Sequence, residues 1–179
     1  MKCIEERRSI RKYKEQDISN DILLQILESA RLAPSGSNTQ PWRFLVVRKE
    51  ETKKRIVEAD HNQKWMLKAP VFVVCVADVG CRIKESDSLH LDENSSLPEL
   101  KLIIRDTAIA IEHILLEAQE QGIGTCWTGW YEQQDMREAI GIPDNMYICG
   151  VITMGYSAEN VSARPRHKMD DIVMYEEWK

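Results

Sequence analysis

The stretch of this chain that says most about its fold reads Pro34-Ser35-Gly36-Ser37-Asn38-Thr39-Gln40-Pro41-Trp42. Small hydroxyl and amide side chains dominate it, and such groups both donate and accept hydrogen bonds. A turn between a helix and a strand needs only a few residues of this kind. We therefore interpret the stretch as a site for a ligand whose edge presents donors beside acceptors, with a plain helix-to-strand connection as the alternative.

Regular secondary structure is predicted on both sides of this stretch. A helix over 19–33 precedes it, with apolar residues at helical spacing and Ser19 as the N-cap. A short strand over 44–47 follows. Further helices are predicted over 50–59, 98–121 and 133–140, further strands over 71–77, 124–130 and 147–154, and a long polar loop over 79–97. This alternation, without tight hairpin signals, predicts one mixed α and β domain over residues 1–179.

Composition excludes several classes of function. The 179 residues carry a formal net charge of -5, which argues against attraction to nucleic acid or to an anionic membrane surface. No apolar run approaches the roughly 20 residues of a membrane span. Five cysteines lack any C-x-x-C pair, which suits reduced thiols in the cytoplasm. The four histidines lack metal-ligand spacing, so no metal site is expected.

Two basic clusters lie near opposite ends of the chain. The first contains Arg7, Arg8, Ser9 and Arg11. Guanidinium groups bind phosphate through paired hydrogen bonds, and a serine hydroxyl can add another. The second cluster is Arg164-Pro165-Arg166. Each cluster alone is also compatible with a solvated basic surface, so neither identifies a phosphate site unaided.

A glycine- and tryptophan-rich stretch follows the long helix predicted over 98–121. It reads Gly122-Ile123-Gly124-Thr125-Cys126-Trp127-Thr128-Gly129-Trp130. Its glycines lack the G-x-G-x-x-G spacing of a dinucleotide site, and a helix precedes them where a strand should. Glycines beside aromatic residues favour a backbone pressed against a flat ring. The alternative is a tightly packed core strand.

These four features resemble, in their order and spacing, the nitroreductase family of FMN enzymes over nearly the whole chain. The stretch over 34–42 is the most specific part of that resemblance. The resemblance implies an α+β fold, in which a central, mostly antiparallel sheet is flanked by helices and two chains form an intertwined homodimer. The chain is shorter than better-known members, and the segment that covers the substrate is the least comparable part.

The resemblance also implies which residues bind the flavin. In one subunit these are Arg7, Arg8, Ser9, Arg11, Asn62, Thr128, Gly129, Arg164 and Arg166. The last two arginines would help hold the phosphate, and the backbone at 128–129 would approach flavin N5. The partner subunit would supply Pro34, Ser35, Gly36, Ser37, Asn38 and Gln40. Arg11 is expected to stabilise the negative charge of the reduced flavin, and no side-chain general acid is required.

The implied activity is electron transfer from NADH or NADPH to a small acceptor by a ping-pong mechanism. A nitroaromatic compound, a quinone or a free flavin would serve as the acceptor. Reductive dehalogenation and flavin fragmentation on the same scaffold remain open alternatives. So does a flavin carrier or redox sensor with little turnover.

A homodimer is also expected from exposed apolar surface. The helix over 98–121 is apolar on many sides, and the tail carries Ile172, Val173, Met174, Tyr175 and Trp178. A monomer whose tail folds back on its own core is the alternative. Cys75 and Cys126 are expected in the core, His113 as a packed or interface residue, and Asp106 and Asp135 as charges on helix surfaces.

Overall fold

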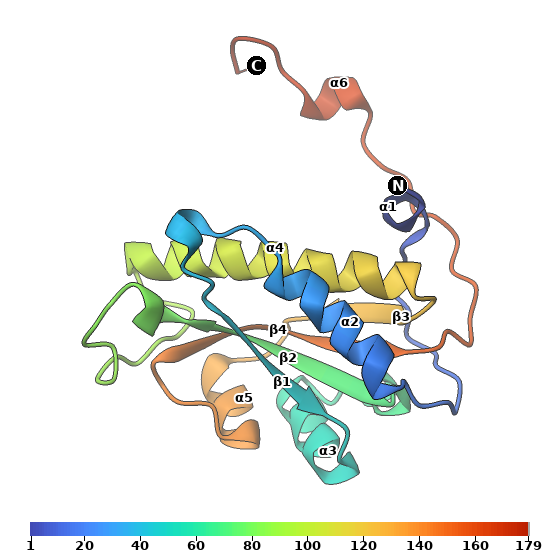
Figure 1. Cartoon of the computed structure of the whole chain (residues 1–179), viewed down its shortest axis with the longest axis horizontal. Coiled ribbons are helices and arrows are strands. Elements are labelled where there is room, and N and C mark those ends of the chain that lie inside the picture. Colours follow the sequence, from blue (N-terminus) through green and yellow to red (C-terminus); the bar gives the residue numbers. More distant parts are fainter. Residues whose placement is uncertain (179) are drawn as a thin grey trace.

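A computed structural model describes residues 1–178 and contains one antiparallel sheet (Figure 1). Its strands are β1 (Trp42–Val47), β2 (Val71–Asp78), β3 (Gly124–Thr128) and β4 (Met146–Gly155). Their spatial order is β1-β2-β4-β3, and every neighbouring pair is antiparallel. The predicted α+β class with an antiparallel central sheet is therefore confirmed.

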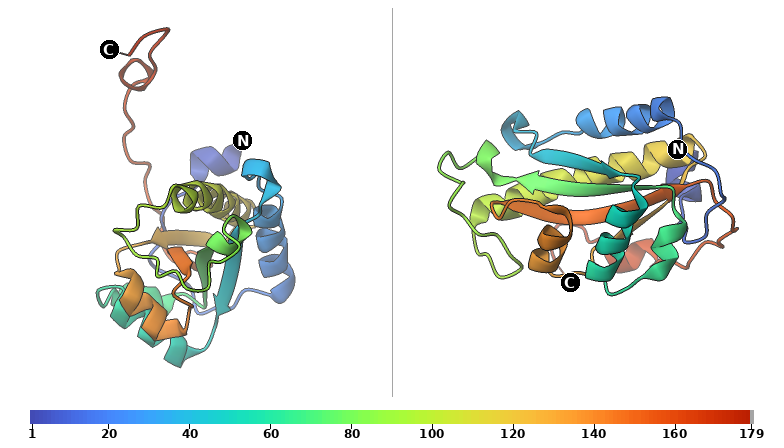
Figure 2. Two further views of the ribbon diagram at one scale, coloured as in Figure 1. Left: turned by 90° about the vertical axis from the view of Figure 1, so that its left-hand side faces the viewer. Right: turned by 90° about the horizontal axis from the view of Figure 1, so that it is seen from below.

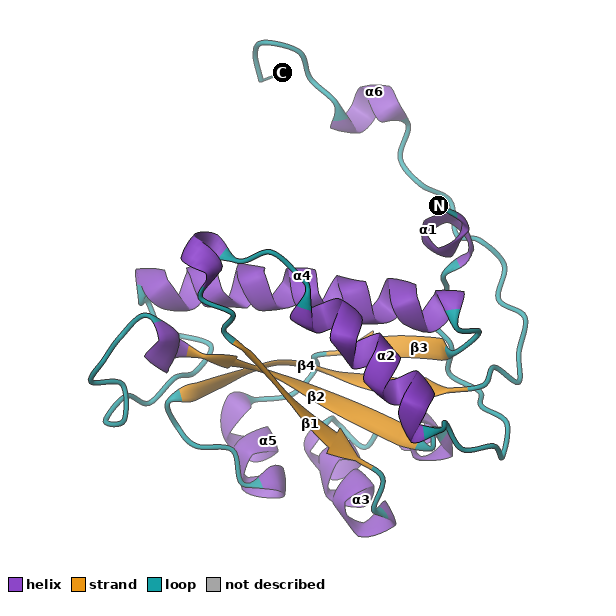
Figure 3. Cartoon of the chain, in the orientation of Figure 1, coloured by secondary structure: helices purple, strands orange, loops and turns teal. Residues whose placement is uncertain are grey.

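Helices cover both faces of this sheet (Figure 3). On one face lie α2 (Asn20–Arg31) and α4 (Pro98–Glu120), and on the other lie α3 (Glu50–Ala59) and α5 (Gln133–Ile140). A strand in the middle of such a sandwich must be apolar on both sides. Residues 71–77 of β2 are all buried, which confirms the prediction made from their continuous apolar run.

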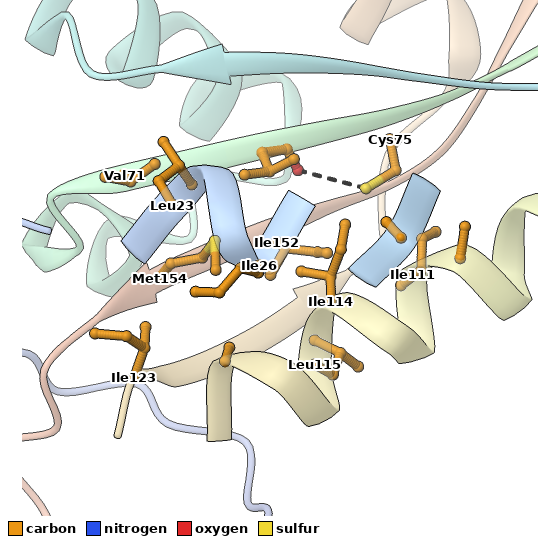
Figure 4. Close-up of a cluster of buried hydrophobic side chains, with 14 of the residues drawn as sticks. Leu23, Ile26, Val71, Cys75, Ile111, Ile114, Leu115, Ile123, Ile152 and Met154 are labelled. Carbon is orange, nitrogen blue, oxygen red and sulfur yellow. Dashed lines mark hydrogen bonds between the residues drawn. The ribbon is translucent and has the colours of Figure 1, made fainter. Parts of the chain in front are cut away.

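The core between α2, α4 and the sheet is built from aliphatic side chains (Figure 4). Ile26 of α2 and Ile114 of α4 are fully buried there, together with Ile152 of β4. Cys75 and Cys126 are both buried, as predicted. Burial raises the pKa of both thiols, so they act as small core side chains.

The predicted helix ends agree with the structure. The Ser19 hydroxyl accepts a hydrogen bond from the backbone N–H of Ile22 at the start of α2. Pro98 opens α4, and Gly122, with φ of 72°, follows its end. Short helical turns complete the fold, namely α1 (Lys2–Glu6), η1 (Gly36–Asn38), η2 (Lys64–Lys68), η3 (Val79–Cys81) and α6 (Met169–Ile172).

Two predictions about loops need correction. Strand β3 ends at Thr128, and Trp130 lies beyond it in an irregular segment. The segment over 79–97 is not simply polar, because Val79 and Leu91 are fully buried in a cluster beside α4. The backbone N–H of Leu91 also donates to the carbonyl of Asp144. Isolated apolar residues at irregular spacing anchor this loop, and such anchors have no periodic signature.

The C-terminal tail extends away from the body of the chain (Figures 1 and 2). Ile172, Tyr175 and Trp178 are exposed along it, and the part within residues 163–178 does not fold back on the core. Over residues 163–178 the single chain therefore differs from the alternative of a monomer whose tail folds back on its own core. Across residues 1–178, every helix falls short of the length or apolar character that crossing a membrane requires.

Candidate functional site

A strongly basic pocket lies where the two ends of the chain meet. Its volume is about 260 Å³, and its lining residues are Arg7, Arg8, Ser9, Arg11, Val161, Ser162, Arg164 and Arg166. The structure therefore brings together both basic clusters, although more than 150 residues separate them in sequence. Neither cluster alone distinguished a phosphate site from a solvated surface. Their convergence favours an anion site.

Backbone pairing explains how these distant segments meet. Ser9 forms a parallel bridge with Thr125 of β3, and Tyr13 forms an antiparallel bridge with Ser157. The carboxylate of Glu159 accepts hydrogen bonds from the backbone N–H groups of Arg11 and Lys12, at 2.7 and 3.0 Å. The N-terminal segment is thus held between β3 and the chain that leaves β4. This arrangement directs the second basic cluster into the pocket.

Few acidic side chains neutralise the pocket. Among its five arginines, only Arg7 forms an ion pair within residues 1–178, with Glu112 at 3.9 Å. The Arg8 side chain donates to the carbonyls of Glu5 and Arg7, and its buried Nε has no hydrogen-bond partner in that part of the chain. An excess of cations with an unused buried donor fits a bound phosphate group.

A second part of the site joins the turn after α3 to the end of β3. The Gln63 amide donates to the Thr128 hydroxyl at 3.0 Å, and that hydroxyl donates to Asp60 at 2.8 Å. The His61 and Trp130 rings stack with their centroids 4.3 Å apart. The exposed Asn62 lies between these contacts in sequence. The structure thus places Asn62 beside the segment containing Thr128 and Gly129.

Arg11 connects the basic pocket to this second part. Its guanidinium lies 5.5 Å from the centroid of the Trp65 ring, a cation–π distance. The Trp65 indole N–H donates to Gln63 Oε1 at 3.1 Å, and Gln63 in turn contacts Thr128. One chain therefore assembles, side by side, a phosphate-type pocket and the strand end expected to face flavin N5.

The loop over 34–40 lies elsewhere in the same chain. Within the described residues, none of the loop lines the basic pocket. The loop packs instead against the first half of α4, where Asp106 accepts a hydrogen bond from the Gly36 N–H at 3.1 Å. Arg82 donates to the Gly36 carbonyl at 3.1 Å and lies 3.5 Å from Asp106. We call these two side chains the Gly36 clamp.

Backbone strain is concentrated in the two segments predicted to touch the ligand. Among residues 1–178, six non-glycine residues have positive φ. Five of these are Ser37, Asn38, Gln40, His61 and Asn62, with φ between 48° and 55°. Left-handed conformations cost free energy in residues that carry a Cβ, and they gather at binding sites. This strain is an independent reason to assign both segments to a site.

Two interpretations from the sequence are corrected here. Asp106 was expected on a helix surface, but its side chain is only 14% exposed and forms half of the Gly36 clamp. Gly124 was expected against a flat ring, but a Cβ there would lie 2.8 Å from Ile10. Aromatic rings lie against two other glycines, the Trp127 ring against Gly150 and the Tyr13 ring against Gly155. Each partner is distant in sequence, so no local pattern identified it.

Sequence reasoning also missed three side chains. Asp60 resembles an ordinary helix end, Gln63 an ordinary polar turn residue, and Arg82 a charge in a polar loop. Their roles depend on contacts with Thr128 and Gly36, which only the fold creates. Across residues 1–178, no group of three His, Cys, Asp or Glu side chains is arranged to hold a metal ion.

Comparison with known proteins gives consistent matches. A model of the nitroreductase family matches residues 4–80 and 58–156. A protein of Archaeoglobus fulgidus, named "Putative NADH dehydrogenase/NAD(P)H nitroreductase", is 36% identical over 160 residues, which cover 87% of this chain and 84% of that protein. A Bacillus subtilis protein named "FMN reductase [NAD(P)H]" is 28% identical over 93% of this chain and 69% of its own length. The crystal structure of a nitroreductase family protein from Clostridium novyi NT, 31% identical, superimposes with a TM-score of 0.74 and covers 88% of this chain and 84% of that one.

Proposed function

Because this chain belongs to the nitroreductase family, we propose that it binds FMN and transfers electrons from NADH or NADPH to a small acceptor. A nitroaromatic compound, a quinone or a free flavin fits this role. FMN, when bound, supplies the redox chemistry, and the protein supplies position and electrostatics. The observation that carries the proposal is the convergence of five arginines in one pocket, on a segment that pairs with β3 through Ser9 and Thr125. These arginines are Arg7, Arg8, Arg11, Arg164 and Arg166.

Each group of residues has a defined task in this proposal. The arginines of the pocket hold the phosphate of FMN through charge-assisted hydrogen bonds. Arg11, stacked on Trp65, faces the developing negative charge and stabilises it. The backbone at Gly129 borders open space, because a Cβ there would meet no atom within 4 Å. The electron donor would occupy that space first and the electron acceptor second, as a ping-pong mechanism requires.

We further propose a homodimer in which each chain completes the other chain's site. Ser35, Ser37, Asn38 and Gln40 are separated from the basic pocket of their own chain, so they are available to a partner. Leu102 and Ile109 on α4 are each 41% exposed, and the extended tail presents Ile172, Tyr175 and Trp178. Apolar exposure on this scale marks an interface, and two-fold assemblies are the commonest.

The test is a visible spectrum of the purified protein, followed by anaerobic titration with NADH and NADPH and then a panel of acceptors. We expect a yellow protein with one FMN per chain. NADH or NADPH should bleach the yellow colour, and a quinone should restore it. A protein that stays colourless when incubated with FMN would contradict the cofactor assignment. A protein that binds FMN but turns over none of the acceptors would instead support the carrier alternative.

A further inference from the structure

The side chain of Asp60 is an unexplained buried acid beside the end of β3. Its exposed fraction is 0%, and its Oδ1 atom is buried without a hydrogen-bond partner in the described residues. Within residues 1–178, its carboxyl group forms no ion pair with lysine or arginine. The titratable groups around it are His61 of the same turn, Cys126 of β3 and Tyr131 beyond it. An ionised carboxylate in this position is costly.

The environment of Asp60 favours its protonated form. Burial raises the pKa of its carboxyl group, while hydrogen bonds from Thr128 and Gln63 and the nearby His61 act in the opposite direction. The net direction is upward, so Asp60 retains its proton to a higher pH than an exposed aspartic acid. A buried carboxyl group whose pKa lies above its ordinary value suits the storage and release of a proton.

The hydrogen bonds around Thr128 have a defined direction. The Trp65 indole can only donate, so Gln63 must turn its Oε1 toward Trp65 and its Nε2 toward Thr128. A hydroxyl has one proton and two acceptor positions. When Asp60 is ionised, the Thr128 proton lies on the 2.8 Å bond to Asp60 Oδ2. When Asp60 is protonated, Asp60 and Gln63 fill both acceptor positions of Thr128, and its proton turns outward.

We propose that Asp60 and Thr128 form a proton relay that delivers a proton to the electron acceptor. Asp60 Oδ2 holds the proton, and Thr128 Oγ1 receives it while passing its own proton outward. In this proposal the outward proton faces the space beside the next residue, Gly129, where a Cβ would meet no atom within 4 Å and where the acceptor would lie. This inference rests on the proposed function.

The relay balances the reduction of a quinone or nitro group. A quinone gains two electrons and two protons to become a hydroquinone, and a nitro group gains the same and loses one oxygen as water to become a nitroso group. A hydride that originates from NAD(P)H brings both electrons and one of the protons. The second proton breaks its bond to Thr128 Oγ1 and forms a bond to the acceptor oxygen. The Asp60 proton replaces it on Thr128, which leaves Asp60 as a carboxylate. The same path in reverse reloads Asp60 from water that enters after the product leaves.

The decisive experiment compares two acceptors in the FMN-loaded protein. A quinone needs a proton, whereas ferricyanide takes electrons only. Asp60→Asn preserves the shape of the side chain and an oxygen that accepts from Thr128, but it has no transferable acidic proton. In stopped-flow measurements on the reduced protein, we expect this variant to react roughly a hundredfold more slowly with the quinone. Its reaction with ferricyanide and its prior reduction by NADH should stay unchanged.

Further variants separate the relay from structural damage. Thr128→Val should lower the quinone rate relative to the ferricyanide rate, and Thr128→Ser, which keeps the hydroxyl, should restore the wild-type ratio. Asp135→Asn is the matched control, because Asp135 is an exposed acid on α5. Asp60→Asn and Thr128→Val both break the relay. If both variants slow equally with the two acceptors, or do not slow with the quinone, the relay is overturned and the proposed function is not affected. A wild-type protein that binds no FMN would instead overturn the proposed function.

Discussion

Arg7 and Arg166 line the same pocket but come from opposite ends of the sequence. Each can therefore be substituted without changing the segment that carries the other arginine. We expect Arg7→Ala and Arg166→Ala each to weaken FMN binding by about 2–4 kcal/mol, because a desolvated charge pair with the phosphate is lost. Fluorescence titration of the apoprotein with FMN measures this change. Riboflavin, which lacks the phosphate, should bind both variants as it binds the wild type.

Arg31→Ala is the matched control for these two variants. Arg31 forms an exposed ion pair with Glu28 on α2, far from the pocket lining. Its removal should leave the FMN dissociation constant unchanged. Unaltered FMN affinity in both pocket variants would show that the phosphate lies elsewhere.

We expect Arg11 to affect the midpoint potential of bound FMN more than the affinity of the protein for FMN. Its stacking on Trp65 places the guanidinium between the basic pocket and the Gln63–Thr128 pair. Arg11→Gln should lower the midpoint potential of bound FMN, because the reduced form loses a neighbouring positive charge. Lys12→Gln makes the same change in charge one residue away, outside the pocket lining. Anaerobic potentiometry should find a clear shift for the first variant and little for the second. Equal shifts would assign the effect to overall charge.

The loop over 34–40 is an element whose conformation depends on its neighbours. Three of its residues have left-handed backbone angles, a conformation that asparagine tolerates but that Ser37 and Gln40 do not favour. The Gly36 clamp holds both backbone polar groups of one residue, with Asp106 on the Gly36 N–H and Arg82 on the Gly36 carbonyl. A Cβ at position 36 would lie 2.7 Å from the terminal Nη2 atom of Arg82, so a larger residue there would displace this guanidinium from the clamp.

Asp106→Ala should therefore loosen this loop. The substitution leaves the partly buried Arg82 without its ion-pair partner, and we expect it to lower the free energy of unfolding by about 1–3 kcal/mol. Hydrogen exchange should accelerate at the Gly36 amide and the following loop amides, and FMN binding should weaken. Glu28→Ala, which removes the acid from an exposed pair, should change none of these quantities. Normal protection of the loop amides in Asp106→Ala would exclude the clamp.

Two parts of the proposed site lie apart in one chain, and this separation predicts that the protein forms a dimer. The basic pocket and the 34–40 loop do not meet in one chain, and the tail lies free of the body (Figure 2). Sedimentation velocity should give a dimer whether or not FMN is bound. A monomer with FMN fully bound would contradict the shared site.

Deleting the residues after Asp171 tests the role of the tail. The deletion removes the exposed Ile172, Tyr175 and Trp178, and we expect weaker dimerisation and partial loss of FMN. Circular dichroism checks that the sheet and helices remain, since residues 172–178 contribute nothing to the clusters of the core. A truncated protein that is still dimeric and fully loaded with FMN would show that the tail is dispensable.

The elements of this fold were predictable from sequence because their signals are local. A continuous apolar run identified the buried strand β2, and helical spacing with Ser19, Pro98 and Gly122 at the ends identified α2 and α4. These signals follow from backbone periodicity and from the capping of unpaired N–H and C=O groups. The residues of the candidate site were also visible as types, since phosphate calls for arginine and a polar ring edge calls for amides and hydroxyls.

Only the tertiary structure decided which of these residues meet. The pairing of Ser9 with Thr125 and the hydrogen bonds to Glu159 bring both basic clusters to one pocket, whereas the 34–40 loop is held at Asp106. The burial of Asp60 beside Thr128 likewise results from the contact between the turn after α3 and the end of β3. Sequence alone determined the chemical types and local conformations, because those depend on near neighbours. Contacts between distant segments depend on how the whole chain buries its apolar faces, and no short stretch encodes that.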